Sequence, residues 1–148
     1  MEDSIVLAST YRLVAVNFWE SAKKLENTME KREDGSPAKL TAIPFYFLVS
    51  QAVELFLKAA LLKRGWEERN LKKYDYRHNL KALLGELQKK DILITDETQT
   101  IVKGLSSQYS SHALRYKFFT NPYMPAPHLI HPMLEELLLV TRISTQGR

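Results

Sequence analysis

The most informative segment of the sequence is Gln51-Ala52-Val53-Glu54-Leu55-Phe56-Leu57-Lys58, which lies inside an apolar run from Ala42 to Leu62. Its polar residues Gln51, Glu54 and Lys58 are spaced three and four positions apart, so they share one face of a helix. The other faces are apolar, as in a helix buried inside a bundle. Because a buried carboxylate and ammonium group need partners, the stretch predicts a central helix with one functional or structural polar stripe.

Further helices are predicted around the central one from apolar periodicity and from helix-start signals. In the first of them, Leu7, Tyr11, Val14 and Phe18 recur at steps of four and three, which is a heptad-like seam. Gly65 is expected to end the central helix. The predicted ranges are 1–31, 41–64 for the central helix, 79–90, 95–113 and 132–145. We therefore predict a single domain over residues 1–148, an all-α, up-and-down helical bundle of about five helices.

Composition limits the classes of function. The 148 residues include no cysteine, which excludes disulfides, thiolate metal sites and a cysteine nucleophile. The acidic start, Met1-Glu2-Asp3, lacks the basic region of a signal peptide. The run from Ala42 to Leu62 has transmembrane length, but charges near its middle each cost about 2.5–3.5 kcal/mol in a bilayer. We expect a cytoplasmic protein with no membrane association and no cofactor.

Two motifs resemble the HEPN superfamily, the small helical domains of prokaryotic defence and toxin–antitoxin systems. The first is Pro44-x-x-x-Leu48-x-x-Gln51-Ala52-x-Glu54-Leu55-x-Leu57-Lys58, and the second is Tyr76-Arg77-His78-Asn79-Leu80. Arg115-Tyr116 is a weaker match. The resemblance implies a helical bundle that is often a homodimer. Many relatives are RNA-cutting toxins or partners of small nucleotidyltransferases, so an antitoxin or a nucleotidyltransferase is an expected partner protein.

The chain departs from the catalytic members of that superfamily at one motif. Those members carry an arginine followed, after four to six residues, by a histidine. No arginine in this sequence precedes any of its four histidines at that spacing. The resemblance therefore does not carry the metal-independent ribonuclease activity over to this chain.

A polar cluster is predicted around the central helix. For Glu54 and Lys58, three interpretations are open: a salt bridge at a helix or subunit interface, a polar pocket in which Glu54 holds Arg115 or His78, and a catalytic carboxylate. His78 is either a helix cap or a general base near neutral pH. Asn79 is more simply a cap. The predicted cluster consists of Gln51, Glu54, Lys58, His78, Asn79 and Arg115.

A basic connector follows the central helix, with seven basic and three acidic side chains between Lys63 and Lys81. Trp66, Tyr74 and Tyr76 are interleaved with them, and cations with aromatic rings suit a phosphate backbone with stacked bases. The alternative is a solvated loop whose aromatic rings pack onto the bundle. The predicted nucleic-acid-binding residues are Arg69, Lys72, Lys73, Arg77 and Lys81.

The remaining histidines give little indication of a metal site. His128, His131 and Glu135 have spacings that allow chelation on a helix, but no ligand signature recurs elsewhere. We expect no metal.

Two functions follow from these features. The first is a non-catalytic binding module that engages RNA, a nucleotide or a partner protein. The alternative is a divergent metal-independent ribonuclease toxin in which His78 and Arg115, with Glu54, replace the usual pair.

Overall fold

The computed structural model describes residues 2–28, 33, 39–110 and 124–142. Within these residues the chain forms helices alone, and none of them lies in a β-strand. The elements are α1 (Glu2–Glu26), α2 (Lys39–Leu62), α3 (Glu68–Leu71), the 3-10 helix η1 (Tyr74–Tyr76), α4 (Leu80–Gln88), α5 (Asp96–Ser110) and α7 (Pro127–Thr141). The predicted all-α class is confirmed.

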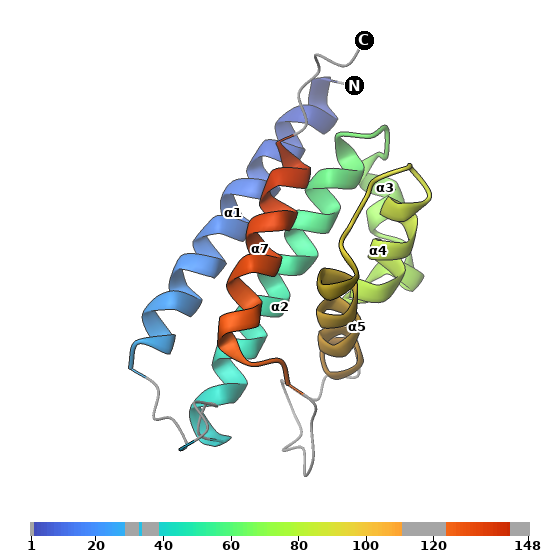
Figure 1. Cartoon of the computed structure of the whole chain (residues 1–148). Helices are drawn as coiled ribbons and strands as arrows, with labels where there is room; N and C mark the ends of the chain where they lie inside the picture. Colours follow the sequence, from blue (N-terminus) through green and yellow to red (C-terminus); the bar gives the residue numbers. More distant parts are fainter. Residues whose placement is uncertain (1, 29–32, 34–38, 111–123, 143–148) are drawn as a thin grey trace.

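The long helix α2 is the centre of the bundle. It packs against α1 and α7 on one side and against α4 and α5 on the other (Figure 1). Its segment Ile43–Leu62 is long and apolar enough to span a membrane, and 72% of that window is buried by the rest of the protein. The apolar run is therefore accounted for by the core of the bundle.

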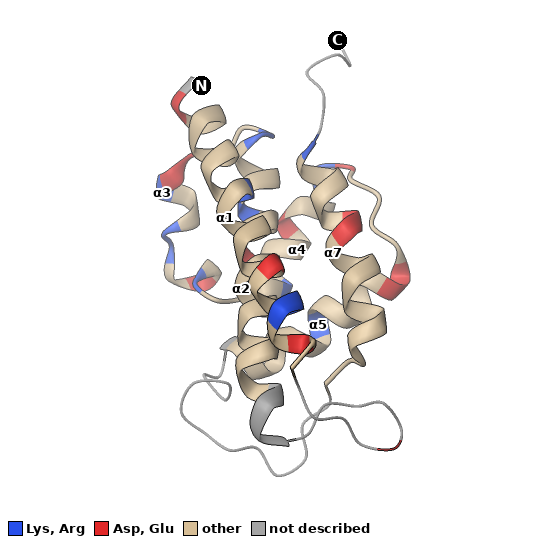
Figure 2. Cartoon of the chain, turned by 90° about the vertical axis from the view of Figure 1, so that its left-hand side faces the viewer, with Lys and Arg blue, Asp and Glu red and all other residues tan. Residues whose placement is uncertain are grey.

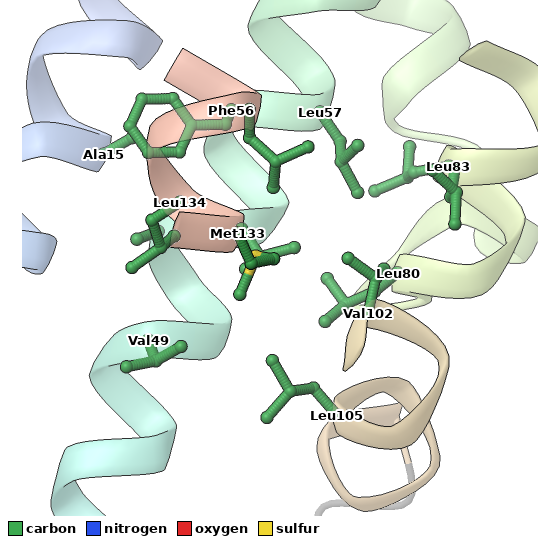
Figure 3. Close-up of a cluster of buried hydrophobic side chains, with 14 of the residues drawn as sticks. Ala15, Val49, Phe56, Leu57, Leu80, Leu83, Val102, Leu105, Met133 and Leu134 are labelled. Carbon is green, nitrogen blue, oxygen red and sulfur yellow. The ribbon is translucent and has the colours of Figure 1, made fainter. Parts of the chain in front are cut away.

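The core forms where α2 meets α1, α4, α5 and α7. The Phe56 ring of α2 meets Trp19 of α1 edge to face at 6.4 Å between centroids and lies on the side of Ala15, whereas Leu57 faces Leu83 of α4 (Figure 3). Each such aliphatic or aromatic side chain contributes about 1.5–3 kcal/mol when it is fully buried. The partners drawn from α4, α5 and α7 are Leu80, Leu83, Val102, Leu105, Met133 and Leu134.

The helix ends follow local chemistry. Gly65 has a φ of +100°, Trp66 N–H donates to the Leu61 carbonyl at 3.1 Å, and Gly65 N–H approaches the Leu62 carbonyl at 3.4 Å. This is a Schellman turn, in which glycine takes the left-handed position, so the predicted stop is confirmed. Asn79, not His78, caps α4: its side chain accepts a hydrogen bond from Ala82 N–H at 3.1 Å.

Two predicted boundaries are wrong by five residues. The first helix ends at Glu26 and not at residue 31, because the N–H and Oγ1 of Thr28 both donate to the Leu25 carbonyl and close the last turn. The last helix begins at Pro127 and not at Pro132. Pro127 suits a first helical position. Pro132 lies inside the helix, where it supplies no N–H donor, and α7 continues past it to Thr141.

The other boundaries differ by smaller amounts. α2 begins two residues before the predicted 41 and ends two before 64, and α4 ends at Gln88 in place of residue 90. α5 begins after Thr95, whose Oγ1 accepts from Thr98 N–H at 3.3 Å, so Thr95 is the cap. The predicted ends at residues 113 and 145 lie outside the described residues.

Candidate functional site

Glu54 is the centre of the predicted polar cluster and is only 3% exposed. Lys58 Nζ lies 2.6 Å from its Oε2. Its Oε1 accepts from the Tyr109 hydroxyl at 2.6 Å and lies 3.0 Å from His78 Nδ1. α2, α5 and His78, which lies two residues before α4, therefore all contribute a hydrogen-bonding group to one buried carboxylate.

The charge of Glu54 is set by opposing effects. Burial raises the pKa of the Glu54 carboxyl, while the Lys58 charge and the hydrogen bonds from Lys58, Tyr109 and His78 lower it. Taken together, the lowering effects outweigh burial, so the pKa of Glu54 lies below its ordinary value and the carboxylate is ionised at neutral pH. Because an ionised carboxylate only accepts hydrogen bonds, His78 Nδ1 carries a proton and donates a hydrogen bond to Glu54.

His78 is held in an uncommon backbone conformation. Its φ of +52° is left-handed, which L-residues adopt rarely and which recurs at functional sites. The ring meets Tyr109 edge to face at 5.4 Å between centroids, and its side chain is 34% exposed. An imidazole oriented by the Glu54 carboxylate therefore lies at the surface of the cluster.

The structure brings three of the six predicted cluster residues together: Glu54, Lys58 and His78. Asn79 is adjacent to them as a helix cap, and Gln51 makes no side-chain hydrogen bond within the described part of the chain. Arg115 lies outside the described residues. Tyr109 was missed, because its position on the apolar face of α5 indicated packing alone; a buried tyrosine hydroxyl usually has a hydrogen-bond partner, and that was the available signal.

The basic connector is partly neutralised by its own acids. Arg69 Nε lies 3.1 Å from Glu67, and Lys72 Nζ lies 3.1 Å from Glu68. Acidic and basic residues alternate along α3 and the chain that follows it (Figure 2). Two of the five predicted nucleic-acid-binding residues are thus in ion pairs, although exposed pairs of this kind contribute little to stability and exchange readily.

The other three, Lys73, Arg77 and Lys81, are exposed and have no ion-pair partner among the described residues. Tyr74, which lies between Lys73 and Arg77 in the chain, has 86% of its surface exposed. We call Lys73, Tyr74, Arg77 and Lys81 the connector patch.

The other two aromatic rings of the connector are packed. Trp66 meets Tyr76 edge to face at 5.1 Å, and the Tyr76 hydroxyl donates to Glu86 of α4 at 2.8 Å. The expectation that the aromatic side chains pack onto the bundle therefore holds for Trp66 and Tyr76, and Tyr74 is the exception.

His131 is fully engaged in hydrogen bonds and is not arranged as a metal ligand. Its Nδ1 accepts from Trp19 Nε1 at 3.1 Å, and its Nε2 lies 2.7 Å from Glu26. Because an indole N–H only donates, the ring proton is on Nε2 and points to Glu26. Across the described ranges, no group of three or more His, Asp or Glu side chains is close enough to hold a metal ion.

A groove of about 530 Å³ lies between the start of α1 and α3. The carboxylates of Asp3, Glu67 and Glu68 line it together with Val6 and Leu7. Of the predicted site residues, Arg69 lines this groove. It is therefore distinct from the Glu54 cluster.

The family model of the HEPN domain matches residues 44–123, which is more than half of the chain. The match includes α2, α4 and α5, and with them Glu54, Lys58, His78 and Tyr109. No curated protein and no solved structure shows significant similarity to the chain. The chain belongs to the HEPN domain family.

Proposed function

We propose that this HEPN domain is a non-catalytic binding module for single-stranded RNA or a nucleotide, and that the connector patch is its contact surface. The observation that carries the proposal is Tyr74, a ring exposed over 86% of its surface in a segment whose cations Lys73, Arg77 and Lys81 have no ion-pair partner among the described residues. Stacking of one base on such a ring is worth about 1–3 kcal/mol, and lysine and arginine supply the phosphate contacts.

The contact is made by side chains and not by the start of α4. Lys81 lies in the first turn of α4, where an acidic side chain is favoured and none is present. The adjacent backbone donors are already used, since Lys81 N–H donates to Ser106 Oγ at 3.0 Å and Ala82 N–H donates to Asn79. The N-terminal end of α4 thus makes the electrostatic potential of the patch more positive, but its Lys81 and Ala82 N–H groups are not available to a ligand.

A salt-dependent binding assay tests the proposal. The full chain is titrated into a fluorescent single-stranded RNA, and the affinity is measured at two salt concentrations for the parent, for Lys73→Glu/Arg77→Glu and for Tyr74→Ala. We expect the double variant to lose at least about tenfold in affinity and to show a smaller salt slope. Tyr74→Ala should lose affinity with an unchanged slope.

The matched control is Lys24→Glu/Lys103→Glu, which changes the net charge equally at exposed positions on α1 and α5. If this control weakens RNA binding as much as the patch variant does, the binding is a general effect of charge and the connector patch is not the site.

The second candidate function is the ribonuclease, and the His78–Glu54 contact favours it. A buried carboxylate at 3.0 Å orients the imidazole, and the ring reaches the surface, which is the arrangement of a general base. In this proposal His78 takes the proton from an RNA 2′-hydroxyl, whose oxygen then bonds to the adjacent phosphorus as the P–O5′ bond breaks. Water supplies the proton to the leaving 5′-oxygen, and Arg115 neutralises the phosphate.

Cleavage of an RNA pool on a denaturing gel, with and without a chelator, separates the two functions. Chelator-resistant cleavage that is lost in His78→Ala and in Arg115→Ala establishes the nuclease. Intact RNA together with patch-dependent binding supports the module, in which His78→Ala leaves the affinity unchanged.

For assembly, we propose a cytoplasmic homodimer that pairs with an antitoxin or nucleotidyltransferase. The support is an apolar face on α1, where Ile5, Val6 and Leu13 are 47%, 63% and 62% exposed. Such a face is unusual on a monomer. Light scattering of the parent and of Val6→Glu/Leu13→Glu tests it: a dimer that dissociates in the variant supports the proposal, and a monomeric parent contradicts it.

A further inference from the structure

Three cations from different parts of the chain meet at the last turn of α7, and we call Arg12, Lys63 and Arg64 the cation cluster. Arg12 Nε donates to Thr141 Oγ1 at 3.1 Å, and Lys63 Nζ donates to the Thr141 carbonyl at 2.5 Å. Arg64 donates from Nη2 to the Val140 carbonyl at 3.2 Å and from Nη1 to the Ala60 carbonyl at 2.8 Å. α1, the end of α2 and the end of α7 are therefore joined at one point.

The cation cluster has no acidic partner among the residues that the structure describes. In the part of the chain that the structure describes, none of the three side chains forms an ion pair. The ends of α2 and α7 each supply about half a negative charge, against three formal positive charges. Burial, and then the neighbouring charges of Arg12 and Arg64, lower the pKa of Lys63, which shows that the cations repel one another.

Helix capping explains only two of the three cations. Lys63 and Arg64 bind the Thr141 and Val140 carbonyls, as basic groups do at helix ends. Within the described ranges Arg12 donates no hydrogen bond to a carbonyl, and its side chain bonds the hydroxyl of Thr141, which in turn donates to the Leu138 carbonyl at 2.6 Å. A third cation at this place therefore adds repulsion without adding a backbone cap.

We infer that the cation cluster is a binding site for a small tetrahedral oxyanion of the phosphate class. Arg12 keeps both terminal guanidinium nitrogens for a planar, two-bond contact with such an anion, and Lys63 keeps two ammonium protons. All three side chains are partly exposed, so an anion reaches them from solvent. The site shares no residue with the connector patch, so the experiments that test it do not depend on the proposed function.

Thermal unfolding of the full chain in inorganic phosphate, compared with chloride at equal ionic strength, is the first test. A bound anion stabilises the folded state in proportion to the logarithm of its concentration above its Kd. We expect a rise in Tm in phosphate that chloride does not reproduce. Equal Tm values in the two salts would overturn the inference.

The variants Arg12→Gln and Arg12→Lys locate the site, with Arg69→Gln as the matched control at an exposed arginine. Arg12→Gln should weaken phosphate binding by about tenfold or more, the effect of losing one charge-assisted contact. Arg12→Lys should retain part of it, and Arg69→Gln should bind as the parent does. If Arg12→Gln and Arg69→Gln weaken binding equally, the anion is not in the cation cluster.

Phosphate titration of ¹⁵N-labelled parent protein gives a readout that needs no variant. The Arg12 Nε–H resonance should shift with the same apparent Kd as the Tm effect, and an unmoved resonance contradicts the site. Repeating the titration with a nucleoside monophosphate and with a 5′-phosphorylated oligonucleotide separates the sources of the phosphate group. Competition by inorganic phosphate indicates that they share the cluster.

Discussion

Two histidine–glutamate pairs in this molecule use the same groups in opposite ways. In His78–Glu54 the carboxylate is the hub: it is buried and takes hydrogen bonds from three different side chains. In His131–Glu26 the histidine is the bridge, because Trp19 donates to one ring nitrogen and the other donates to Glu26. The first pair lies within the matched family domain, and His131 and Glu26 lie outside it.

The difference shows which member of each pair the fold depends on. Removing Glu54 takes the acceptor from three donors, of which the Tyr109 side chain is fully buried. Removing Glu26 takes the acceptor from one donor, His131, whose side chain is 27% exposed. A chemically identical substitution should therefore have unequal effects at the two sites, and the four predictions below use that inequality.

The largest effect is expected from Glu54→Leu, compared with Glu26→Leu. Glu54→Leu removes the buried acceptor of the Lys58 ammonium group and of the Tyr109 hydroxyl, which costs about 3–5 kcal/mol. Glu26→Leu removes one hydrogen bond at a partly exposed site, about 0.5–1.5 kcal/mol. Denaturant unfolding followed by circular dichroism measures both, and equal losses at the two positions would show that Glu54 is not a hub.

The second effect comes from deleting a single hydroxyl. Tyr109→Phe removes a buried donor to the ionised Glu54 and should cost about 1.5–3 kcal/mol. Tyr76→Phe is the matched control, since Tyr76 also donates to a glutamate, Glu86, but at the surface. It should cost less than about 1 kcal/mol. If the two variants unfold at the same denaturant concentration, burial of the carboxylate does not set the strength of these bonds.

The third prediction compares the stability of the alanine and asparagine variants at each histidine. The more stable of the two variants should differ between His78 and His131. At His78 the φ of +52° favours asparagine, because a left-handed alanine costs about 1 kcal/mol or more. At His131, inside α7, alanine should be the more stable variant by about 0.5 kcal/mol, from helix propensity. The same order at both positions would contradict the strain assigned to His78.

The polar stripe and the caps were predictable because their chemistry is local. Glu54 and Lys58 are one helical turn apart, and His78 directly precedes the asparagine that caps α4. The Trp19–His131–Glu26 bridge was not predictable, since its bonds join residues 112 and 105 positions apart. Nothing in the spacing of an amphipathic helix specifies which polar group meets which across the bundle.

In the basic connector, too, the contacts between residues near in sequence were predictable and the contacts between distant segments were not. The sequence places seven cations in one segment, and the structure divides them among three roles. Lys63 and Arg64 turn to the end of α7, Arg69 and Lys72 pair with acids one helical turn or less away, and the remainder face solvent. The pairing of Lys72 with Glu68 follows from their spacing of four, but the direction taken by Lys63 and Arg64 depends on where α7 lies.

The smallest effect concerns acid stability, because the pKa shift of Glu54 is the balance of burial, which raises it, and of the Lys58 charge and three hydrogen bonds, which lower it. Since the folded pKa lies below the ordinary value of 4.5, Glu54 contributes stability that is fully present above that value and is lost as pH falls through the folded pKa. The difference in the free energy of unfolding between the parent and Glu54→Gln should therefore shrink as pH falls below 4.5. Denaturant titrations of both proteins at several acidic pH values measure that difference. A difference that stays constant with pH would mean that the three donors bind the protonated carboxyl as well as the ionised one. The stabilisation by Glu54 would then come from its packing and not from its charge.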